Sequence, residues 1–178
     1  MGEDSLRIGL IGLGSMGRHH ARVIRATPGM ELVAVADPGG DRFGVAGPLP
    51  LLPDVEALIG AGIDAAVVAV PTIHHEEVAL ALARAGVHAL VEKPIAHCSR
   101  AGRRVADAFA ERDLVGAVGY VERCNPALRA LRERLDAGEL GQVYQVLTRR
   151  QGPFPARIND VGVVKDLATH DIDLTAWV

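Results

Sequence analysis

The amino-acid sequence predicts an α/β protein in which a doubly wound parallel sheet is followed by an incomplete second α/β domain. Short apolar runs alternate with helical patterns from the start of the chain to Tyr120, which is typical of strand–helix–strand units. Of the 178 residues, 49% are hydrophobic but only 3% are aromatic, so small aliphatic side chains must fill the core. Parallel strands that are covered on both faces have this composition. After Tyr120 the alternation stops, and a second domain is predicted.

The strands and helices of the first domain are predicted from apolar periodicity and from the turn residues between them. The predicted strands are residues 6–11, 30–36, 64–70, 88–92 and 115–120. The predicted helices are residues 15–26, 55–61, 75–85 and 99–112, the third closed by Gly86 and the last capped by Ser99. Residues 44–53 are rich in Pro and Gly and receive no prediction.

The two domains are predicted to span residues 1–122 and 123–178. Residues 126–137 form a charged helical pattern, and residues 142–149 alternate between two kinds of side chain, which predicts a strand with two different faces. A final helix is predicted from about residue 164 and has no stop signal. A strand needs partners, and the remaining sequence offers none, so we expect the chain to end inside this domain.

Composition and charge argue against several classes of partner. The chain has 19 basic and 22 acidic residues and few aromatic rings for stacking, so nucleic-acid binding is not expected. Its two cysteines, Cys98 and Cys124, have no metal-type spacing, which favours a reducing compartment over a disulfide framework. The start lacks the basic segment of a signal peptide, and Gly and Asp interrupt the longest apolar stretch, residues 57–71. We expect a cytoplasmic protein without a membrane segment.

Residues 12–17 read GLGSMG, a GxGxxG motif that follows a predicted strand and opens a predicted helix. In this context the motif predicts a site for the pyrophosphate of a dinucleotide. Gly12 permits the tight turn, Gly14 lets the backbone approach the phosphates, and Gly17 lets the helix pack closely on the strand. The N–H groups at the start of the helix would bind the anion. A glycine-rich turn without a ligand is the alternative.

An acidic residue, Asp37, stands at the end of the second predicted strand, 20 residues after Gly17. A carboxylate at this distance is expected to accept hydrogen bonds from the ribose hydroxyls and to repel a 2′-phosphate. The sequence therefore favours NAD over NADP. Arg42 weakens that preference and leaves NADP as the alternative.

Lys93 follows the fourth predicted strand, in the sequence Glu92-Lys93-Pro94. Ligands of open parallel sheets bind at the carboxyl ends of the strands. A lysine at this place can therefore hold a substrate oxygen by charge and hydrogen bonding. A solvated surface lysine is the alternative.

The last predicted helix carries Asp166, His170 and Asp173 on one face, at spacings of four and three. Buried charges are costly unless they are paired, and histidine is the natural proton acceptor near neutral pH. We interpret His170 as a general base and Asp166 as the group that orients it or the substrate. The alternatives are an ordinary solvated face and a metal site, although nothing nearby supplies further metal ligands.

The other histidines and the cysteines carry weaker signals. Residues 74–77 (HHEE) are predicted to cap a helix, with His75 lining the cofactor crevice. Three histidines are predicted to be structural or solvent-facing: His19, His20 and His97. Neither cysteine has a neighbouring base, which argues against a thiol mechanism.

Six motifs in this order resemble the glucose–fructose oxidoreductase, inositol dehydrogenase and MocA family of NAD(P)-dependent oxidoreductases. They are GLGSMG, Asp37 after VAVA, PTIHH at 71–75, EKP at 92–94, GYVERCNP at 119–126 and DLATHDID at 166–173. The resemblance covers essentially the whole chain. It implies an amino-terminal Rossmann domain and a carboxy-terminal α/β domain on an open, mostly antiparallel sheet, most of which is absent from this chain.

The resemblance also implies roles for particular residues. Lys93, Asp166 and His170 fall on the catalytic positions, where His170 takes the proton of a sugar hydroxyl and Lys93 holds the same oxygen while hydride passes to the nicotinamide. The implied cofactor-binding residues are Gly12, Gly14, Ser15, Met16, Gly17, Asp37, Pro71, Thr72, His75, Glu92 and Lys93. Substrate contacts are expected from the three catalytic residues and from Arg123, Asn125 and Arg157.

Within the family, residues 152–173 and VERCNP resemble the UDP-N-acetylglucosamine 3-dehydrogenase branch, although related ketosugar reductases share much of the pattern. This implies oxidation at C3 of a UDP-linked amino sugar or its uronate, in a homo-oligomer. Cys124 departs from the pattern, since an aromatic residue is commoner there. Two other functions stay open: a non-catalytic dinucleotide-binding sensor, and an inactive fragment of such an enzyme.

Overall fold

The structure is a computed structural model that describes residues 5–151, 162 and 164–178, with only the backbone of residues 165 and 166. The chain divides into two compact units, Met1–Val118 and Gly119–Val178, which we call the amino-terminal and the carboxy-terminal unit. This division falls a few residues before the expected domain boundary at 122/123, which stays a prediction.

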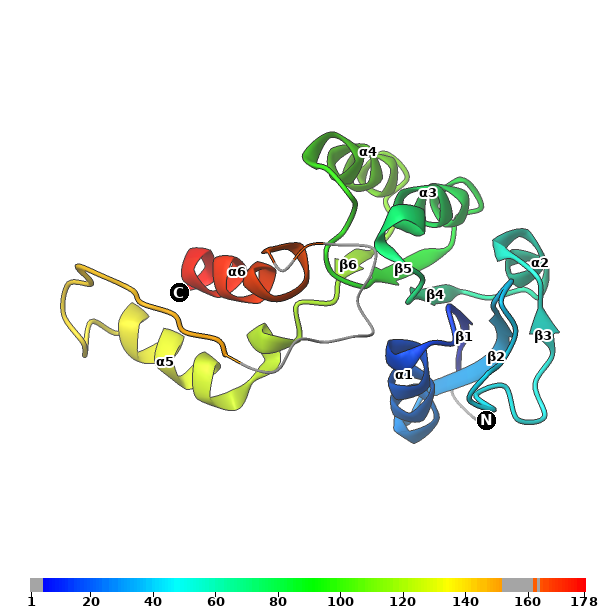
Figure 1. The fold of residues 1–178 in the computed structure, drawn as a ribbon, viewed down its shortest axis with the longest axis horizontal. Coiled ribbons are helices and arrows are strands. Elements are labelled where there is room, and N and C mark those ends of the chain that lie inside the picture. Colours follow the sequence, from blue (N-terminus) through cyan, green and yellow to red (C-terminus); the bar gives the residue numbers. More distant parts are fainter. Residues whose placement is uncertain (1–4, 152–161, 163) are drawn as a thin grey trace. The chain divides into compact units, whose positions relative to one another are not determined.

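The amino-terminal unit is built on one sheet of six strands in the order β3-β2-β1-β4-β5-β6, and every neighbouring pair is parallel (Figure 1). The strands are β1 (Leu6–Ile11), β2 (Met30–Ala36), β3 (Leu51–Leu52), β4 (Ala65–Val68), β5 (His88–Val91) and β6 (Gly116–Val118). From β1 the chain runs outward to β3 and then crosses back to β4 on the other side of β1. This is the doubly wound topology that the sequence predicts, and the fold class is confirmed.

One strand escaped prediction. β3 lies in the Pro- and Gly-rich segment 44–53, where its two residues pair with Val35 and Ala36 of β2. A strand of two residues is too short to show an alternating pattern, so only its partner reveals it.

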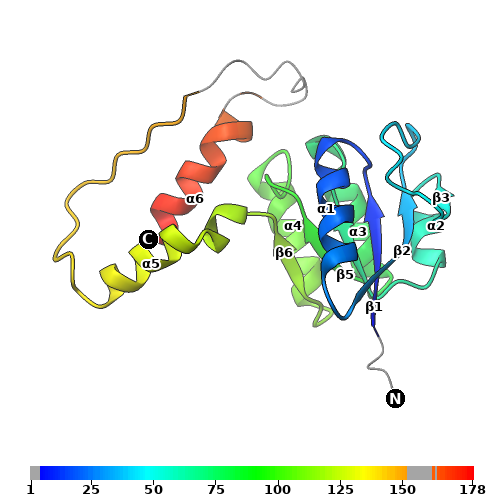
Figure 2. The same ribbon diagram turned by 90° about the horizontal axis from the view of Figure 1, so that it is seen from below.

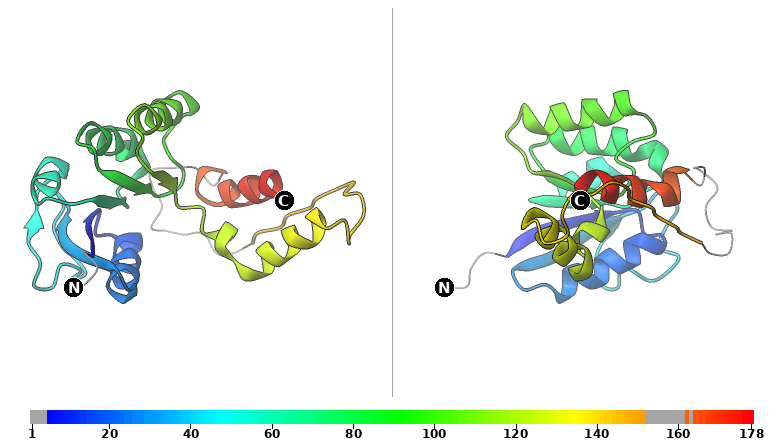
Figure 3. Two further views of the ribbon diagram at one scale, coloured as in Figure 1. Left: turned by 180° about the vertical axis from the view of Figure 1, so that it is seen from behind. Right: turned by 90° about the vertical axis from the view of Figure 1, so that its left-hand side faces the viewer.

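Helices cover both faces of this sheet. They are α1 (Ser15–Ala26), α2 (Val55–Gly60), the short 3-10 turn η1 (Thr72–His74), α3 (His75–Arg84) and α4 (Ser99–Ala110). In Figure 3 (right), α1 in blue lies on one side of the sheet, and α3 and α4 in green lie on the other. The prediction that Ser99 caps α4 is wrong, because the extended backbone that precedes the helix belongs to Cys98 and Ser99 is already helical.

The apolar core follows from strand alternation. In β1, Leu10 points into the cluster under α1, while Ile11 points into the cluster under α2, α3 and α4. Leu58 and Leu82 fill the second cluster and are fully buried. Each such leucine contributes about 1.5–3 kcal/mol through burial. The sheet is therefore held from both faces, which fixes the strand ends where the predicted ligand residues lie.

The carboxy-terminal unit contains the 3-10 turn η2 (Val121–Cys124), helix α5 (Pro126–Asp136), the π-helical turn η3 (Val164–Ala168) and helix α6 (Thr169–Trp177). None of the described residues of α5 or α6 is buried. Polar contacts join these elements: Arg123 of η2 pairs with Asp173 of α6, and Arg132 of α5 stacks on the ring of Trp177. Among the described residues of both units, no helix has the length and apolar character needed to cross a bilayer.

The strand predicted over residues 142–149 is not formed. The segment is irregular and exposed, and appears in Figure 2 as a thin coil between α5 and the grey trace. Tyr144 is 88% exposed and Leu147 is 86% exposed. A strand needs a neighbour to satisfy its backbone groups, and the described part of this unit contains no strand with which the segment could pair.

Candidate dinucleotide-binding site

The predicted cofactor residues of the amino-terminal unit lie where its parallel strands end. The glycine turn follows β1, Asp37 follows β2, Pro71 and Thr72 follow β4, and Glu92 and Lys93 follow β5. The carboxyl ends of parallel strands meet at one edge of a sheet. The crevice of a doubly wound sheet opens where the winding reverses, which here lies between β1 and β4.

Two of the three motif glycines are required by the fold itself. Gly12 has a φ of +92°, and a Cβ at this position would lie 2.4 Å from the carbonyl carbon of Ala69. A Cβ at Gly17 would lie 1.9 Å from the carbonyl oxygen of Gly12. Both positions bring backbone against backbone, so no larger residue fits. These two glycines would be needed whether or not a ligand binds.

Gly14 differs from both. Its φ of −71° and ψ of −159° are ordinary extended values, which any residue adopts. A Cβ built on Gly14 meets nothing within 4 Å among the protein atoms. The fold therefore gives no reason for glycine here, whereas a phosphate group lying against this backbone does. The site fits the group that the sequence predicts.

The start of α1 is suited to an anion. Gly14 is the N-cap residue, no side chain caps the helix, and no acidic residue lies in its first turn. The first N–H groups of a helix lack partners inside the helix and carry partial positive charge. Ser15 is half-buried and Met16 is exposed beside these amides. A pyrophosphate placed here would accept hydrogen bonds from them.

Asp37 ties the end of β2 to the glycine turn. Its Oδ2 accepts a hydrogen bond of 2.7 Å from the N–H of Leu13, and its Oδ1 accepts one of 2.8 Å from the N–H of Gly39. Each carboxylate oxygen has a second lone pair, so the group can also accept from ribose hydroxyls. Arg42 is the residue that the sequence predicts to weaken the preference for NAD over NADP. Its guanidinium lies 5.8 Å from the centre of the Phe43 ring.

Glu92 is 6% exposed, and its carboxylate accepts two hydrogen bonds, one of them from the backbone of Lys93. Its Oε1 accepts a hydrogen bond of 2.7 Å from Nε2 of His20, and its Oε2 accepts one of 3.1 Å from the backbone N–H of Lys93. Burial raises the pKa of Glu92, but the hydrogen bond and charge of His20, together with Lys93, outweigh burial and hold the pKa below its ordinary value.

The partnership of His20 with Glu92 was missed by the sequence prediction, which had His20 as structural or solvent-facing. A signal was present: Gly17, Ala21 and Ile24 are the buried positions of α1, and His20 lies three residues after the first and four before the last. Its neighbour His19 is exposed. The helical period therefore separates the two histidines.

His75 does not line the crevice as predicted. Its ring is 1% exposed, with Nδ1 at 2.8 Å from the carbonyl oxygen of Pro94 and Nε2 at 2.9 Å from that of Val70. Because both nitrogens face backbone carbonyls, the ring has no free polar atom for a cofactor. The preceding His74 is the exposed one.

The predicted substrate residues of the carboxy-terminal unit make contacts within that unit. Nε and Nη2 of Arg123 donate to the two oxygens of Asp173 at 2.8 and 2.5 Å, and this ion pair raises the pKa of Arg123. Asn125 caps α5 by accepting from the N–H of Ala127. Arg157 and the side chain of Asp166 lie outside the described residues. The ring of His170 is half-buried on α6.

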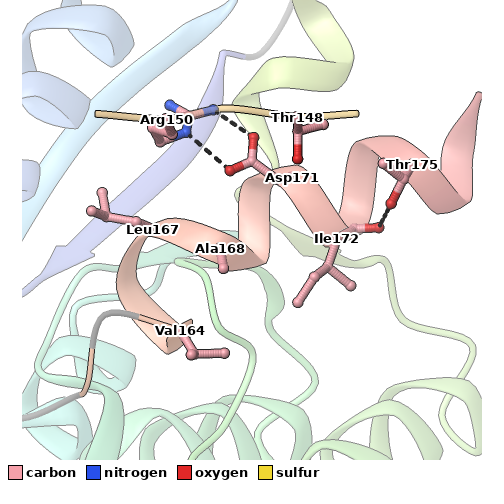
Figure 4. Close-up of a pocket in the computed structure, with 8 residues that line it drawn as sticks. All are labelled: Thr148, Arg150, Val164, Leu167, Ala168, Asp171, Ile172 and Thr175. Carbon is pink, nitrogen blue, oxygen red and sulfur yellow. Dashed lines mark hydrogen bonds and ion pairs between the residues drawn. The ribbon is translucent and has the colours of Figure 1, made fainter. Parts of the chain in front are cut away.

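A pocket of about 370 Å³ lies against η3 and α6 (Figure 4). Asp171, Ile172 and Thr175 line it, and Arg150 donates to Asp171 across its rim. Residues 170, 173 and 177 lie on the opposite side of a helix with 3.6 residues per turn. The pocket is therefore not part of the predicted catalytic face.

The sheet, the glycine turn, the uncapped start of α1 and the acid after β2 together define the amino-terminal unit as a dinucleotide-binding Rossmann domain. The sequence profile of an oxidoreductase family with an NAD-binding Rossmann fold matches residues 6–120. The chain belongs to this family, that of glucose–fructose oxidoreductase, inositol dehydrogenase and MocA.

Individual relatives agree with this assignment. The chain is 37% identical over 173 residues to a UDP-N-acetylglucosamine 3-dehydrogenase of Acidithiobacillus ferrooxidans, covering 96% of this chain and 53% of the relative. It is 31% identical over 186 residues to a scyllo-inositol 2-dehydrogenase (NAD(+)) of Bacillus subtilis, covering 99% and 54%. A crystal structure of scyllo-inositol dehydrogenase from Lactobacillus casei, with bound NAD(H) and scyllo-inositol, shares the fold with a TM-score of 0.84 at 23% identity, covering 97% and 56%. The chain thus spans about half the length of the curated relatives it matches.

Proposed function

We propose that this chain binds NAD at the carboxyl edge of its sheet and forms part of a dehydrogenase that acts on a hydroxyl group of a sugar or polyol. The observation that carries the proposal is Gly14 at the uncapped start of α1, where the fold gives no reason for glycine and the adjoining helix amides have no side-chain cap. The pyrophosphate would rest on the amides that begin α1, and Asp37 would accept from the adenosine ribose. Pro71 and Thr72 would border the crevice after β4.

When bound, the nicotinamide supplies the hydride acceptor. Lys93 would donate a hydrogen bond to the substrate oxygen and stabilise the negative charge that develops on it. His170 would take the hydroxyl proton, and Asp166 would orient either the imidazole or the substrate. Arg123, Asn125 and Arg157 stay proposed substrate contacts, and for Arg123 such a contact would compete with Asp173.

Composition supports a specific role for Lys93. Of the 19 basic residues, 17 are arginine, and the only lysines are Lys93 and Lys165. A surface cation in this chain is therefore usually arginine. An ammonium is a compact charge that can also change its protonation state, which a guanidinium does not do. A lysine at position 93 is therefore better explained by a need for an ammonium group than by a solvated surface charge, for which this chain usually has arginine.

We propose a UDP-linked amino sugar or its uronate, oxidised at C3, as the substrate. The 37% identity to a UDP-N-acetylglucosamine 3-dehydrogenase supports it. The 31% identity to a scyllo-inositol 2-dehydrogenase makes inositols the comparison substrates. NADH formation with UDP-N-acetylglucosamine, its uronate and scyllo-inositol, measured on the longest natural form of the protein, separates these choices. Turnover of scyllo-inositol alone would contradict the nucleotide-sugar proposal.

NAD binding is tested with the same substitution, glycine to alanine, at two positions, one inside and one outside the proposed site. Gly14→Ala is expected to weaken NAD binding by tenfold or more, about 1.4 kcal/mol, because a methyl group would occupy the space for the phosphates. Gly60 also has open space around its Cβ position and no positive φ. Gly60→Ala should therefore leave the affinity unchanged. Equal affinities of the two variants in calorimetric titrations would refute the site.

A further inference from the structure

Two part-buried contacts hold the Glu92-Lys93-Pro94 turn from opposite faces of the sheet. His20, on α1, bonds the Glu92 carboxylate that also accepts the N–H of Lys93. His75, at the start of α3, places its Nδ1 at 2.8 Å from the carbonyl oxygen of Pro94. α1 packs on one face of the sheet, and α3 packs on the other. Lys93 therefore lies between two anchored neighbours.

Each histidine is also linked to a second segment at this edge of the sheet. The ring of His75 contacts the carbonyl oxygen of Val70, which follows β4, so it joins the ends of β4 and β5. His20 stands one turn into the helix whose first amides would hold the pyrophosphate. Both side chains are thus linked to the backbone on which the cofactor is proposed to lie, although neither is placed to touch it.

We propose that His20 and His75 are positioning residues that together fix the Glu92-Lys93-Pro94 turn and so set the place of the Lys93 ammonium group. We call His20 and His75 the clamp. The importance of the Lys93 ammonium group for catalysis rests on the proposed function, whereas the existence of the clamp does not rest on it. An imidazole suits the task because it is short and rigid, and in its neutral form its single N–H can sit on whichever ring nitrogen faces the acceptor. Alanine at position 20 would leave an oxygen of the buried Glu92 carboxylate without this partner, which costs about 1–3 kcal/mol. Alanine at position 75 would remove the contact to the half-buried Pro94.

The sequence supplies a matched control for each residue, since each clamp histidine directly follows an exposed one. His19 precedes His20, and His74 precedes His75. Substitution of an exposed histidine changes composition equally but touches neither Glu92 nor Pro94. Lysine chemistry offers a selective readout, because Lys93 and Lys165 are the only two lysines in the chain.

The test measures acylation of the whole 178-residue chain by a lysine-directed reagent without cofactor, with the Lys93-to-Lys165 rate ratio read by mass spectrometry. We expect His20→Ala and His75→Ala to raise this ratio by about threefold or more, because a turn that is no longer held opens more often and gives the reagent readier access to the Lys93 amine. His19→Ala and His74→Ala should leave it unchanged. His20→Gln, which keeps an N–H donor for Glu92, should restore most of the original ratio.

A ratio that stays unchanged or falls in folded His20→Ala and His75→Ala would overturn the clamp. If His75→Ala does not fold, His75→Leu, which fills the space but has no N–H donor for the Pro94 carbonyl, takes its place under the same criterion. Equal ratios for His20→Gln and His20→Ala would also contradict the proposal, because a merely space-filling role would not distinguish them. No cofactor enters the measurement, so its failure is separate from a failure of Gly14→Ala to weaken NAD binding.

Discussion

The two units of the chain differ in strand pairing and in the burial of their apolar side chains. In the amino-terminal unit each strand has a parallel neighbour, and apolar side chains fill clusters on both faces of the sheet. In the carboxy-terminal unit the described helices bury no residue, and the segment 142–149 leaves Tyr144 and Leu147 exposed. The first unit contains the partners that its sequence pattern requires. In the described part of the second unit, the apolar side chains are at most half-buried.

The difference matters for function, because the proposed cofactor site depends only on the complete unit. Gly14, Asp37 and Glu92 are held by contacts within residues 5–118. His170 and its neighbours lie on a helix that polar contacts tie to η2 and α5. Cofactor binding is therefore expected to survive changes in the second unit, whereas turnover is not.

Hydrogen exchange should show the largest contrast between the units. Amides of β1 and β4, which lie inside the sheet, should exchange at least about a thousandfold more slowly than those of residues 142–149, since they open only with the core. Exchange followed by mass spectrometry on peptides from both segments checks this. Similar rates would mean that the second unit is as well covered as the first.

A pair of leucine substitutions should give the next largest effect. Leu82 is fully buried, so Leu82→Ala is expected to lower the free energy of unfolding by about 2–5 kcal/mol through lost contacts and a cavity. Leu147 is 86% exposed, so Leu147→Ala should change it by less than about 0.5 kcal/mol. Urea denaturation compares the two. A substantial loss with Leu147→Ala would indicate that this side chain is covered in solution.

Acid should weaken the amino-terminal unit through Glu92. The pKa of this group is below its ordinary value of 4.5, so the unfolded chain binds more protons than the folded one across that range. The contribution to stability is complete above about pH 4.5 and is lost as the pH falls through the lower folded pKa. His20→Ala should flatten this dependence, and His19→Ala should not. Unfolding measured at several pH values would contradict the assignment if both variants kept the original slope.

The ion pair between Arg123 and Asp173 should have the smallest effect. The arginine side chain is 45% exposed and that of Asp173 is 8% exposed, so the coupling energy of this half-exposed pair is expected to be about 1 kcal/mol and to fall with added salt. A double-mutant cycle with Arg123→Ala and Asp173→Asn measures it. A coupling of several kcal/mol would mean that this unit depends on the pair far more than a half-exposed arginine allows.

Much of the amino-terminal unit could be predicted because its signals are local. The apolar patterns of residues 6–11 and 15–26, and the glycines beside these segments, can be seen directly in the sequence. The observed β1 and α1 have the same bounds as the predicted strand and helix. The place of Asp37 follows from its position at a strand end. Such features need no knowledge of distant contacts.

The contacts that could not be predicted join residues far apart in the sequence. Which carbonyls the ring of His75 would meet depends on how the ends of β4 and β5 lie beside each other, and no local pattern carries that information. The alternation over 142–149 is present in the sequence, but such a pattern forms a strand only where a partner strand exists. The position of His20 beside the buried face of α1 can be predicted from the helical period. That its partner would be Glu92 cannot be predicted in this way.

Titration of the ¹⁵N-labelled chain with NAD, followed by amide resonances, tests the central claim most directly. We predict that the largest shifts fall on the amides of Gly14, Ser15, Met16 and Gly17, with smaller ones around Asp37, while residues of α5 and α6 stay unchanged. Saturable binding that leaves the amides of residues 14–17 unmoved would contradict the account, because the pyrophosphate would then lie elsewhere.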